Sequence, residues 1–201
     1  MLRVDQLRGD HYGPIDLDVE AGTCLGISGA SGAGKTILLR GIVDLDTNTG
    51  HVSWIGRPRA AMPAPEWRRM VAYVPAETAW WADDVAAHFG DIAAAQSLIE
   101  MAGLPSDALG WDVARLSTGE RHRLGLVRAL ALEPDVLLLD EPTAALDADA
   151  TKRIEALLER ALASGKTIIL VSHDPAQLSR LAKSTVRIVN GRLAETERPA
   201  A

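Results

Sequence analysis

The sequence lacks the features that would tie it to an oxidising compartment, a lipid bilayer or a polyanion. Cys24 is its only cysteine, so no internal disulfide can form and a reducing compartment is expected. No stretch approaches the roughly 18 successive apolar residues of a membrane-spanning helix. The opening residues, MLRVDQLRGD, lack the apolar run of a signal peptide. The formal net charge of −6 gives no overall basic field, so no nucleic-acid partner is expected. Together these absences predict a cytoplasmic protein.

What is present fits one domain in which strands alternate with helices. The 201 residues are 47% hydrophobic and 24% charged, which is ordinary for a globular protein with a sizeable core. Strands are expected at 2–7, 15–19, 23–28, 51–55, 70–74, 136–139 and 167–171, with a last hairpin turned at Asn190-Gly191. Helices are expected at 35–43, 119–132 and 149–163, and an irregular helical pattern at 82–116. Nearly continuous apolar strands between helices predict a mostly parallel sheet covered on both faces.

The stretch GASGAGKT has the composition of a loop that holds phosphate. Its residues are Gly29, Ala30, Ser31, Gly32, Ala33, Gly34, Lys35 and Thr36. They follow an apolar strand and open a helix, which is the context of a P-loop. Glycines let backbone N–H groups and the helix N-terminus face a β-phosphate. Lys35 would then reach the β- and γ-phosphates, and the Thr36 hydroxyl would ligate Mg²⁺. The alternative is a glycine-rich turn without a ligand, which the strand and helix on either side disfavour.

A second motif, VLLLDEP at 136–142, brings two carboxylates to the end of a buried strand. In an open α/β sheet, ligands bind at the carboxyl ends of the strands. Asp140 suits a contact to Mg²⁺ through water, and Glu141 is placed to orient an attacking water as general base. The alternative is a strand capped by acidic residues at the start of the next helix.

Between these motifs lies LSTGE, residues 116–120, and with it the chain resembles an ATP-binding cassette (ABC) ATPase. The family's signature, LSGGQ, corresponds to LSTGE. AALD at 144–147 resembles the family's D-loop, and VSHD at 171–174 resembles its switch-histidine motif. The order and spacing of the motifs match along essentially the whole chain.

The resemblance implies the fold class and the domain organisation. The fold is expected to be α/β, a P-loop NTPase core with a mostly parallel sheet, an N-terminal antiparallel β part and a small helical subdomain. One domain is expected over 1–201, with the core at about 1–81 and 117–201 and the helical subdomain at about 82–116.

The same resemblance implies ATP and Mg²⁺ as cofactors and a second copy of the chain as a partner. Ser117 and Gly119 begin a helix and would offer a hydroxyl, N–H groups and a positive dipole end to ATP on the opposite subunit. Asp147 would lie across that interface of two copies. His173 would contact the γ-phosphate from the attacking side. The ordinary alternatives are Ser117 as a helix N-cap and His173 as a loop histidine.

Several positions depart from the family or carry a weaker signal. Thr118 replaces a signature glycine, and Glu120 replaces the signature glutamine. Ala76 stands where the family usually has a glutamine that contacts Mg²⁺ and the lytic water, so either the adjacent Glu77 substitutes or the site is incomplete. Tyr12 is a candidate for stacking on adenine, with a surface loop tyrosine as the alternative.

Three classes of function compete for an ATPase of this kind. The first is the subunit that energises a separately encoded membrane permease and lies peripherally on the inner face of the cell membrane. The second is a soluble cassette ATPase acting on DNA or ribosomes, and it normally needs a coiled-coil arm or a second cassette. The third, an unrelated P-loop enzyme such as a small-molecule kinase, has no use for the signature or the D-loop. The first is favoured, with Trp80 and Trp81 as candidate docking residues and core packing as their alternative. The transported substrate and its direction stay open.

Overall fold

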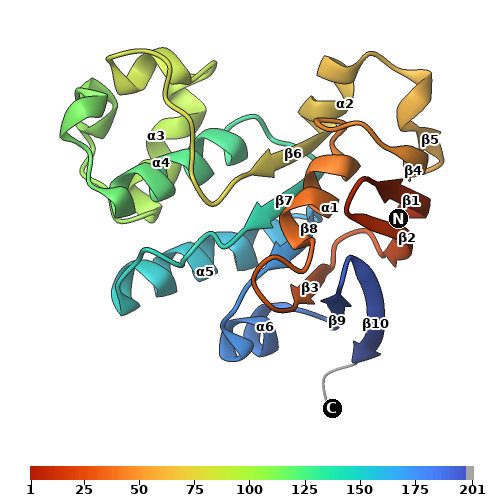
Figure 1. The fold of residues 1–201 in the computed structure, drawn as a ribbon. Helices are drawn as coiled ribbons and strands as arrows, with labels where there is room; N and C mark the ends of the chain where they lie inside the picture. The colour runs from red at the N-terminus through yellow and green to blue at the C-terminus, as the bar shows by residue number, and fades with distance from the viewer. Residues whose placement is uncertain (198–201) are drawn as a thin grey trace.

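Strands and helices alternate along the chain in the computed structural model, which describes residues 1–197 (Figure 1). The strands are β1 (Leu2–Gly9), β2 (Tyr12–Val19), β3 (Cys24–Ser28), β4 (Thr49–Trp54), β5 (Arg57–Pro58), β6 (Val71–Val74), β7 (Val136–Asp140), β8 (Thr167–Val171), β9 (Ser184–Val189) and β10 (Arg192–Glu197). The helices are α1 (Lys35–Ile42), α2 (Ala64–Met70), α3 (Ile92–Met101), α4 (Thr118–Leu130), α5 (Ala148–Ala163) and α6 (Pro175–Leu181). Over the described range, none of these helices has the length and apolar character needed to cross a membrane.

The strands form a mostly parallel sheet and a separate antiparallel sheet within residues 1–197. The larger sheet has the order β10-β9-β3-β8-β7-β6, parallel from β9 to β6, with β10 antiparallel at its edge. The smaller sheet has the order β2-β1-β4-β5 and is antiparallel. These arrangements confirm the expected fold class, including the final hairpin and the N-terminal antiparallel part.

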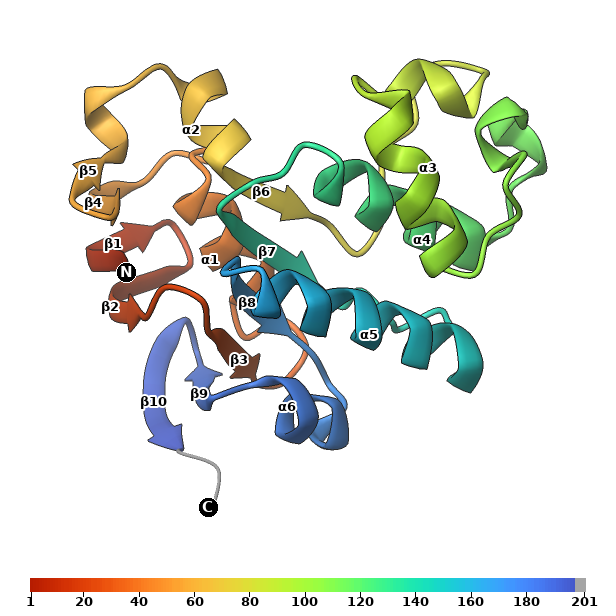
Figure 2. The same cartoon turned by 180° about the vertical axis from the view of Figure 1, so that it is seen from behind.

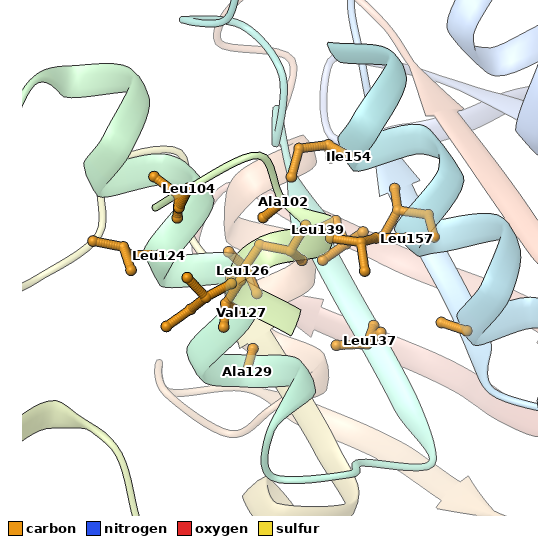
Figure 3. Close-up of a cluster of buried hydrophobic side chains, with 14 of the residues drawn as sticks. Ala102, Leu104, Leu124, Leu126, Val127, Ala129, Leu137, Leu139, Ile154 and Leu157 are labelled. Carbon is orange, nitrogen blue, oxygen red and sulfur yellow. The ribbon is translucent and has the colours of Figure 1, made fainter. Parts of the chain in front are cut away.

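Alternate residues of the parallel strands pack on opposite faces of the larger sheet. In β7, Leu137 and Leu139 join a cluster with α4, α5 and α3, which Figure 3 shows at close range. Their neighbours Val136 and Leu138 join the cluster under α1 and the antiparallel sheet. Both faces are therefore covered, which explains why the parallel strands are apolar at almost every position.

The segment expected to form a helical subdomain is helical and irregular. It contains α3 and three short 3₁₀ turns, Val85–His88, Ala108–Gly110 and Val113–Arg115. Figures 1 and 2 show it with α4 to one side of the parallel sheet, away from the antiparallel sheet. The domain limits themselves remain a prediction.

Helix α4 and the loop after β6 approach each other so closely that a helical glycine is required. A Cβ atom at Gly125 would lie 2.3 Å from Thr78 Cγ2 and 3.0 Å from Thr78 Cβ. The Thr78 hydroxyl also donates to the Arg121 carbonyl oxygen at 3.2 Å. The loop after β6 is thereby held against the helix that begins in the signature.

We expect Gly125→Ala to destabilise the fold by about 1–3 kcal/mol, although alanine is the better helix former, because the β-branched side chain of Thr78 has to move. For a chain of this size that corresponds to a fall in Tm of roughly 2–4 °C per kcal/mol, measured by thermal unfolding. Gly110→Ala is the control, since a Cβ there meets open space and the residue has no left-handed φ. Equal melting temperatures for the two variants would contradict the close contact.

Candidate functional site

The P-loop lies between β3 and α1 and wraps tightly at its glycines. A Cβ at Gly29, where φ is 148°, would meet the Ile188 carbonyl oxygen at 2.5 Å. Gly34, with φ 103°, is the N-cap of α1. Both positions need glycine, because an L side chain is strained in these conformations. Lys35 begins α1 with only 6% of its surface exposed, and its Nζ donates to the carbonyl oxygens of Gly29 at 2.8 Å and Ala30 at 3.0 Å. The loop thus curls around a single buried ammonium group.

Asp140 ends β7 beside the start of α1 and is almost completely buried. Its Oδ2 accepts a hydrogen bond from Thr36 Oγ1 at 2.7 Å and another from the Tyr73 hydroxyl at 3.3 Å. Burial, reinforced by the negative charge of Asp140, raises the pKa of the Tyr73 phenol above its ordinary value. A hydroxyl and a carboxylate therefore meet at one point, and these oxygen ligands are of the kind that Mg²⁺ binds.

Glu141 follows at the edge of the sheet in a backbone conformation that few non-glycine residues adopt. Its φ is 51°, in the left-handed region, and its N–H donates to the Val171 carbonyl oxygen of β8 at 3.0 Å. Such a conformation costs on the order of 1–2 kcal/mol and is concentrated at functional sites. The side chain consequently leaves the line of β7 and enters the space between α1 and the end of β8.

The Glu141 carboxylate meets His173 there. Its Oε2 accepts from the His173 backbone N–H at 3.3 Å. Its Oε1 lies 3.3 Å from His173 Nε2, within ion-pair distance, yet accepts no well-formed hydrogen bond from the residues that the structure describes. His173 Nε2 is also 3.4 Å from Lys35 Nζ. Burial raises the pKa of the Glu141 carboxyl, while the His173 backbone N–H acts in the opposite direction. Glu141 therefore carries a buried oxygen with acceptor capacity to spare.

These groups share one cavity of about 250 Å³. It is lined by residues 31–37 of the P-loop and α1, together with Ala76, Asp140, Glu141 and His173. Ala76, which stands at the position of the family's glutamine, faces the cavity. The neighbouring Glu77 is exposed and does not line the cavity. Glu77 instead lies near His122 of α4, where it opposes the lowering of the His122 pKa by burial. The carboxylate of Glu77 thus does not take the place of the missing glutamine in this structure.

The signature and the D-loop lie beside each other, outside that cavity. Ser117 caps α4 in a capping box: Glu120 Oε2 accepts from both the N–H and the hydroxyl of Ser117 at 2.8 Å. The Ser117 N–H holds the pKa of the Glu120 carboxyl below its ordinary value. A Cβ at Gly119 would lie 3.4 Å from Leu146 of the D-loop, and Asp147 caps α5 by accepting from the Ala150 N–H. Ser117 and Asp147 are exposed, so they form a surface and not part of the pocket.

Comparison with known proteins decides the family. The ABC transporter family model matches residues 12–144. The chain belongs to the ABC transporter family. It is 36% identical over 185 residues to the aliphatic sulfonates import ATP-binding protein SsuB 3 of Nocardia farcinica, covering 90% of this chain and 72% of that protein. It is also 36% identical over 208 residues to the Nod factor export ATP-binding protein I of Cupriavidus metallidurans, covering 96% of this chain and 68% of that protein.

Solved structures agree with this assignment. The ATP-binding cassette MJ0796, solved as a dimer in a post-hydrolysis state with ADP and Pi, shares the fold with a TM-score of 0.88 at 22% identity, covering all of both chains. An ATP-binding subunit of an ABC transporter matches with a TM-score of 0.87 at 26% identity, covering 98% of this chain and 89% of that one. This chain is thus an ABC ATPase that binds ATP.

Tyr12 does not fit the role of an adenine platform in this ABC ATPase. Its side chain is only 6% exposed and packs in the core under α1. Gly9 and Gly41 make room for the ring, since a Cβ at either would collide with it. Stacking requires an exposed ring face, so we interpret Tyr12 as a packing residue.

The two candidate docking tryptophans have different surroundings. Trp81 is 70% exposed, whereas Trp80 is partly buried against the cluster around α4 and donates from Nε1 to Thr78 Oγ1 at 3.1 Å. Both rings contact the buried His88 edge-on, at centroid distances of 4.8 and 4.5 Å, and the Arg128 guanidinium lies over both. His88 Nε2 accepts from the Trp81 N–H at 2.9 Å, which fixes this loop. Trp80 is therefore a packing residue, and only Trp81 stays a candidate for docking.

The sequence analysis considered Ser117 as an N-cap but missed the reciprocal contact from Glu120, and it missed the contact between Tyr73 and Asp140. The Ser117 capping box is readable, because serine followed three residues later by glutamate is its known pattern. The contact of Tyr73 with Asp140 can be predicted only once the pairing of β6 with β7 is known. Tyr73 pairs with Leu138, and Leu138 precedes Asp140 by two residues. Because side chains alternate along a strand, Tyr73 and Asp140 lie on the same face of the sheet.

Proposed function

We propose that this chain is the ATP-hydrolysing subunit that energises a separately encoded membrane permease through closure of two copies around ATP. The observation that carries the proposal is the shared cavity, in which Lys35, Thr36, Asp140, Glu141 and His173 converge from the ends of three neighbouring strands. Lys35, now bonded to loop carbonyls, would turn to the β- and γ-phosphates when nucleotide enters. The P-loop N–H groups would bind the remaining phosphate oxygens.

Thr36 at the end of the P-loop and Asp140 beside it fit a magnesium ion brought in with ATP. Thr36 Oγ1 and Asp140 Oδ2 supply hydroxyl and carboxylate oxygens at the cavity wall. Among residues 1–197 no cluster of three or more histidine, cysteine or acidic side chains could hold a metal by itself. Mg²⁺ typically uses one or two protein ligands together with phosphate oxygens and water, which matches this set. Bound there, the ion would neutralise charge that develops on the phosphates.

Glu141 would take a proton from the attacking water, and His173 would contact the γ-phosphate. The spare acceptor capacity of Glu141 Oε1 suits this role, since a water in the cavity gives that oxygen its missing donor. Ala76 adds only a methyl group, so the water would be held by one group fewer than in most relatives of this family. We therefore expect slow turnover in the isolated subunit.

The surface formed by the signature and the D-loop would close on the P-loop of a second copy. Ser117, Gly119 and Asp147 are adjacent and lie outside their own cavity, which is the placement required of residues that act on a partner's nucleotide. Such an arrangement is isologous, so each copy would complete the other's site.

The permease would dock at an apolar groove of about 310 Å³ beside Trp81. The groove runs along α4 and β6 and is lined by Leu45, Val74, Trp81, Arg128 and Leu132, among others. Relatives of equal identity carry names for sulfonate import and Nod factor export, so the proposal names no substrate and no direction. It places the subunit in the cytoplasm, peripherally on the inner face of the membrane.

We expect Trp81→Ala to weaken permease binding by about 2 kcal/mol or more, roughly thirtyfold, while ATP binding and Tm stay as in the wild type. The measurement is capture of the tagged chain with detergent-solubilised membranes, scored for an integral membrane protein. Ile55→Ala is the control, since Ile55 is 63% exposed in the turn between β4 and β5 and does not line the groove. Capture of the same membrane protein by both variants would place the dock elsewhere, and a fall in Tm for Trp81→Ala would indicate a packing role.

A further inference from the structure

Two donors meet on one oxygen of Asp140, and only one of them belongs to the P-loop. Thr36 Oγ1 lies 2.7 Å from Asp140 Oδ2, and the Tyr73 hydroxyl lies 3.3 Å from the same atom. Tyr73 comes from β6, whose pairing with β7 sets Tyr73 opposite Leu138. The two strands therefore hold the phenol and the carboxylate on one face of the sheet, in fixed register.

The buried carboxylate of Asp140 depends on these two hydrogen-bond donors. Asp140 is only 3% exposed, and a buried charge without hydrogen bonds is costly. Thr36 is a shared donor, because its hydroxyl would turn toward Mg²⁺ when nucleotide enters. At that moment the Tyr73 hydroxyl is the remaining donor to Oδ2 recorded among residues 1–197.

The Tyr73 ring is held independently of its hydroxyl. It is half-buried and packs against the cluster under α1. The phenol can therefore donate without relying on a flexible side chain, and Tyr73→Phe removes the donor while keeping the packing.

We infer that Tyr73 is a positioning residue for the magnesium site, whose hydroxyl holds the Asp140 carboxylate in place when Thr36 turns to the metal. Partners of this outer kind orient metal ligands, and their removal typically costs on the order of 10- to 100-fold in metal affinity. The inference rests on the proposed function, since it needs MgATP in the cavity. It assigns a role to a strand residue outside the P-loop and outside the DEP motif.

The test is ATP binding to the purified chain by calorimetry at a series of free Mg²⁺ concentrations. For Tyr73→Phe we expect the Mg²⁺ concentration that gives half of the gain in ATP affinity to rise roughly tenfold. The affinity for ATP in EDTA and the Tm should stay as in the wild type, because the ring and the P-loop are intact. A merely structural role would instead lower the Tm and the EDTA affinity together.

A double-mutant comparison isolates the contact. Asp140→Asn should reduce the gain from Mg²⁺ on its own, and adding Tyr73→Phe to it should change nothing further, since the acceptor charge is already gone. An unchanged Mg²⁺ dependence in Tyr73→Phe, or equal effects of Tyr73→Phe with and without Asp140→Asn, would overturn this inference alone. A wild-type chain that binds no ATP would overturn the proposed function as well.

Discussion

Glu141→Gln is expected to lower ATP turnover by roughly 10²–10⁴-fold while ATP binding persists, because an amide cannot take the proton from the attacking water. The substitution keeps the shape of the side chain, and the carbonyl oxygen of the new amide can still accept from the His173 N–H, which now donates to Glu141 Oε2 at 3.3 Å. The measurement is phosphate release at saturating ATP with the binding affinity determined in parallel.

The same variant should accumulate an ATP-dependent dimer, since closed copies would no longer be released by hydrolysis. Light scattering with and without ATP would detect a doubling of mass. Glu159→Gln, on the exposed face of α5, is the matched control and should turn over ATP at the wild-type rate. A monomeric Glu141→Gln variant with full turnover would exclude Glu141 as the base.

The parts of the site that the sequence predicts are those tied to the carboxyl ends of parallel strands. The P-loop follows β3, Glu141 follows β7 and His173 lies just beyond β8, three neighbouring strands of one sheet. Once alternating apolar strands and helices predict a parallel sheet, these ends must share an edge. The convergence of residues more than a hundred positions apart therefore follows from topology and not from any local signal.

What the sequence did not predict depends on packing between segments. Helices α2 and α6 are each only 7 residues long, so their apolar period is too short to read. The burial of Tyr12 on β2 follows from the space left by Gly9 of β1 and Gly41 of α1. The different exposure of Trp80 and Trp81 likewise follows from the position of α4 and His88. The local sequence around two adjacent tryptophans does not predict that position.

Lys35→Ala is expected to abolish measurable ATP binding, a loss of at least about 100-fold, because the cavity then lacks its buried positive charge for the β- and γ-phosphates. Lys35 Nζ makes its hydrogen bonds to the Gly29 and Ala30 carbonyl oxygens, so its removal also leaves two loop acceptors without that donor. The loop geometry itself should survive, since Gly29 and Gly34 hold it by their own backbone conformations and α1 keeps its bond from the Leu38 N–H to the Gly34 carbonyl oxygen. Calorimetry with ATP measures the affinity and thermal unfolding reports the fold, with Lys152→Ala, an exposed lysine of α5, as the control. If Lys35→Ala kept both its Tm and its affinity for ATP, the assignment of residues 29–36 as the phosphate-binding loop would be wrong, however well the rest of the site converges.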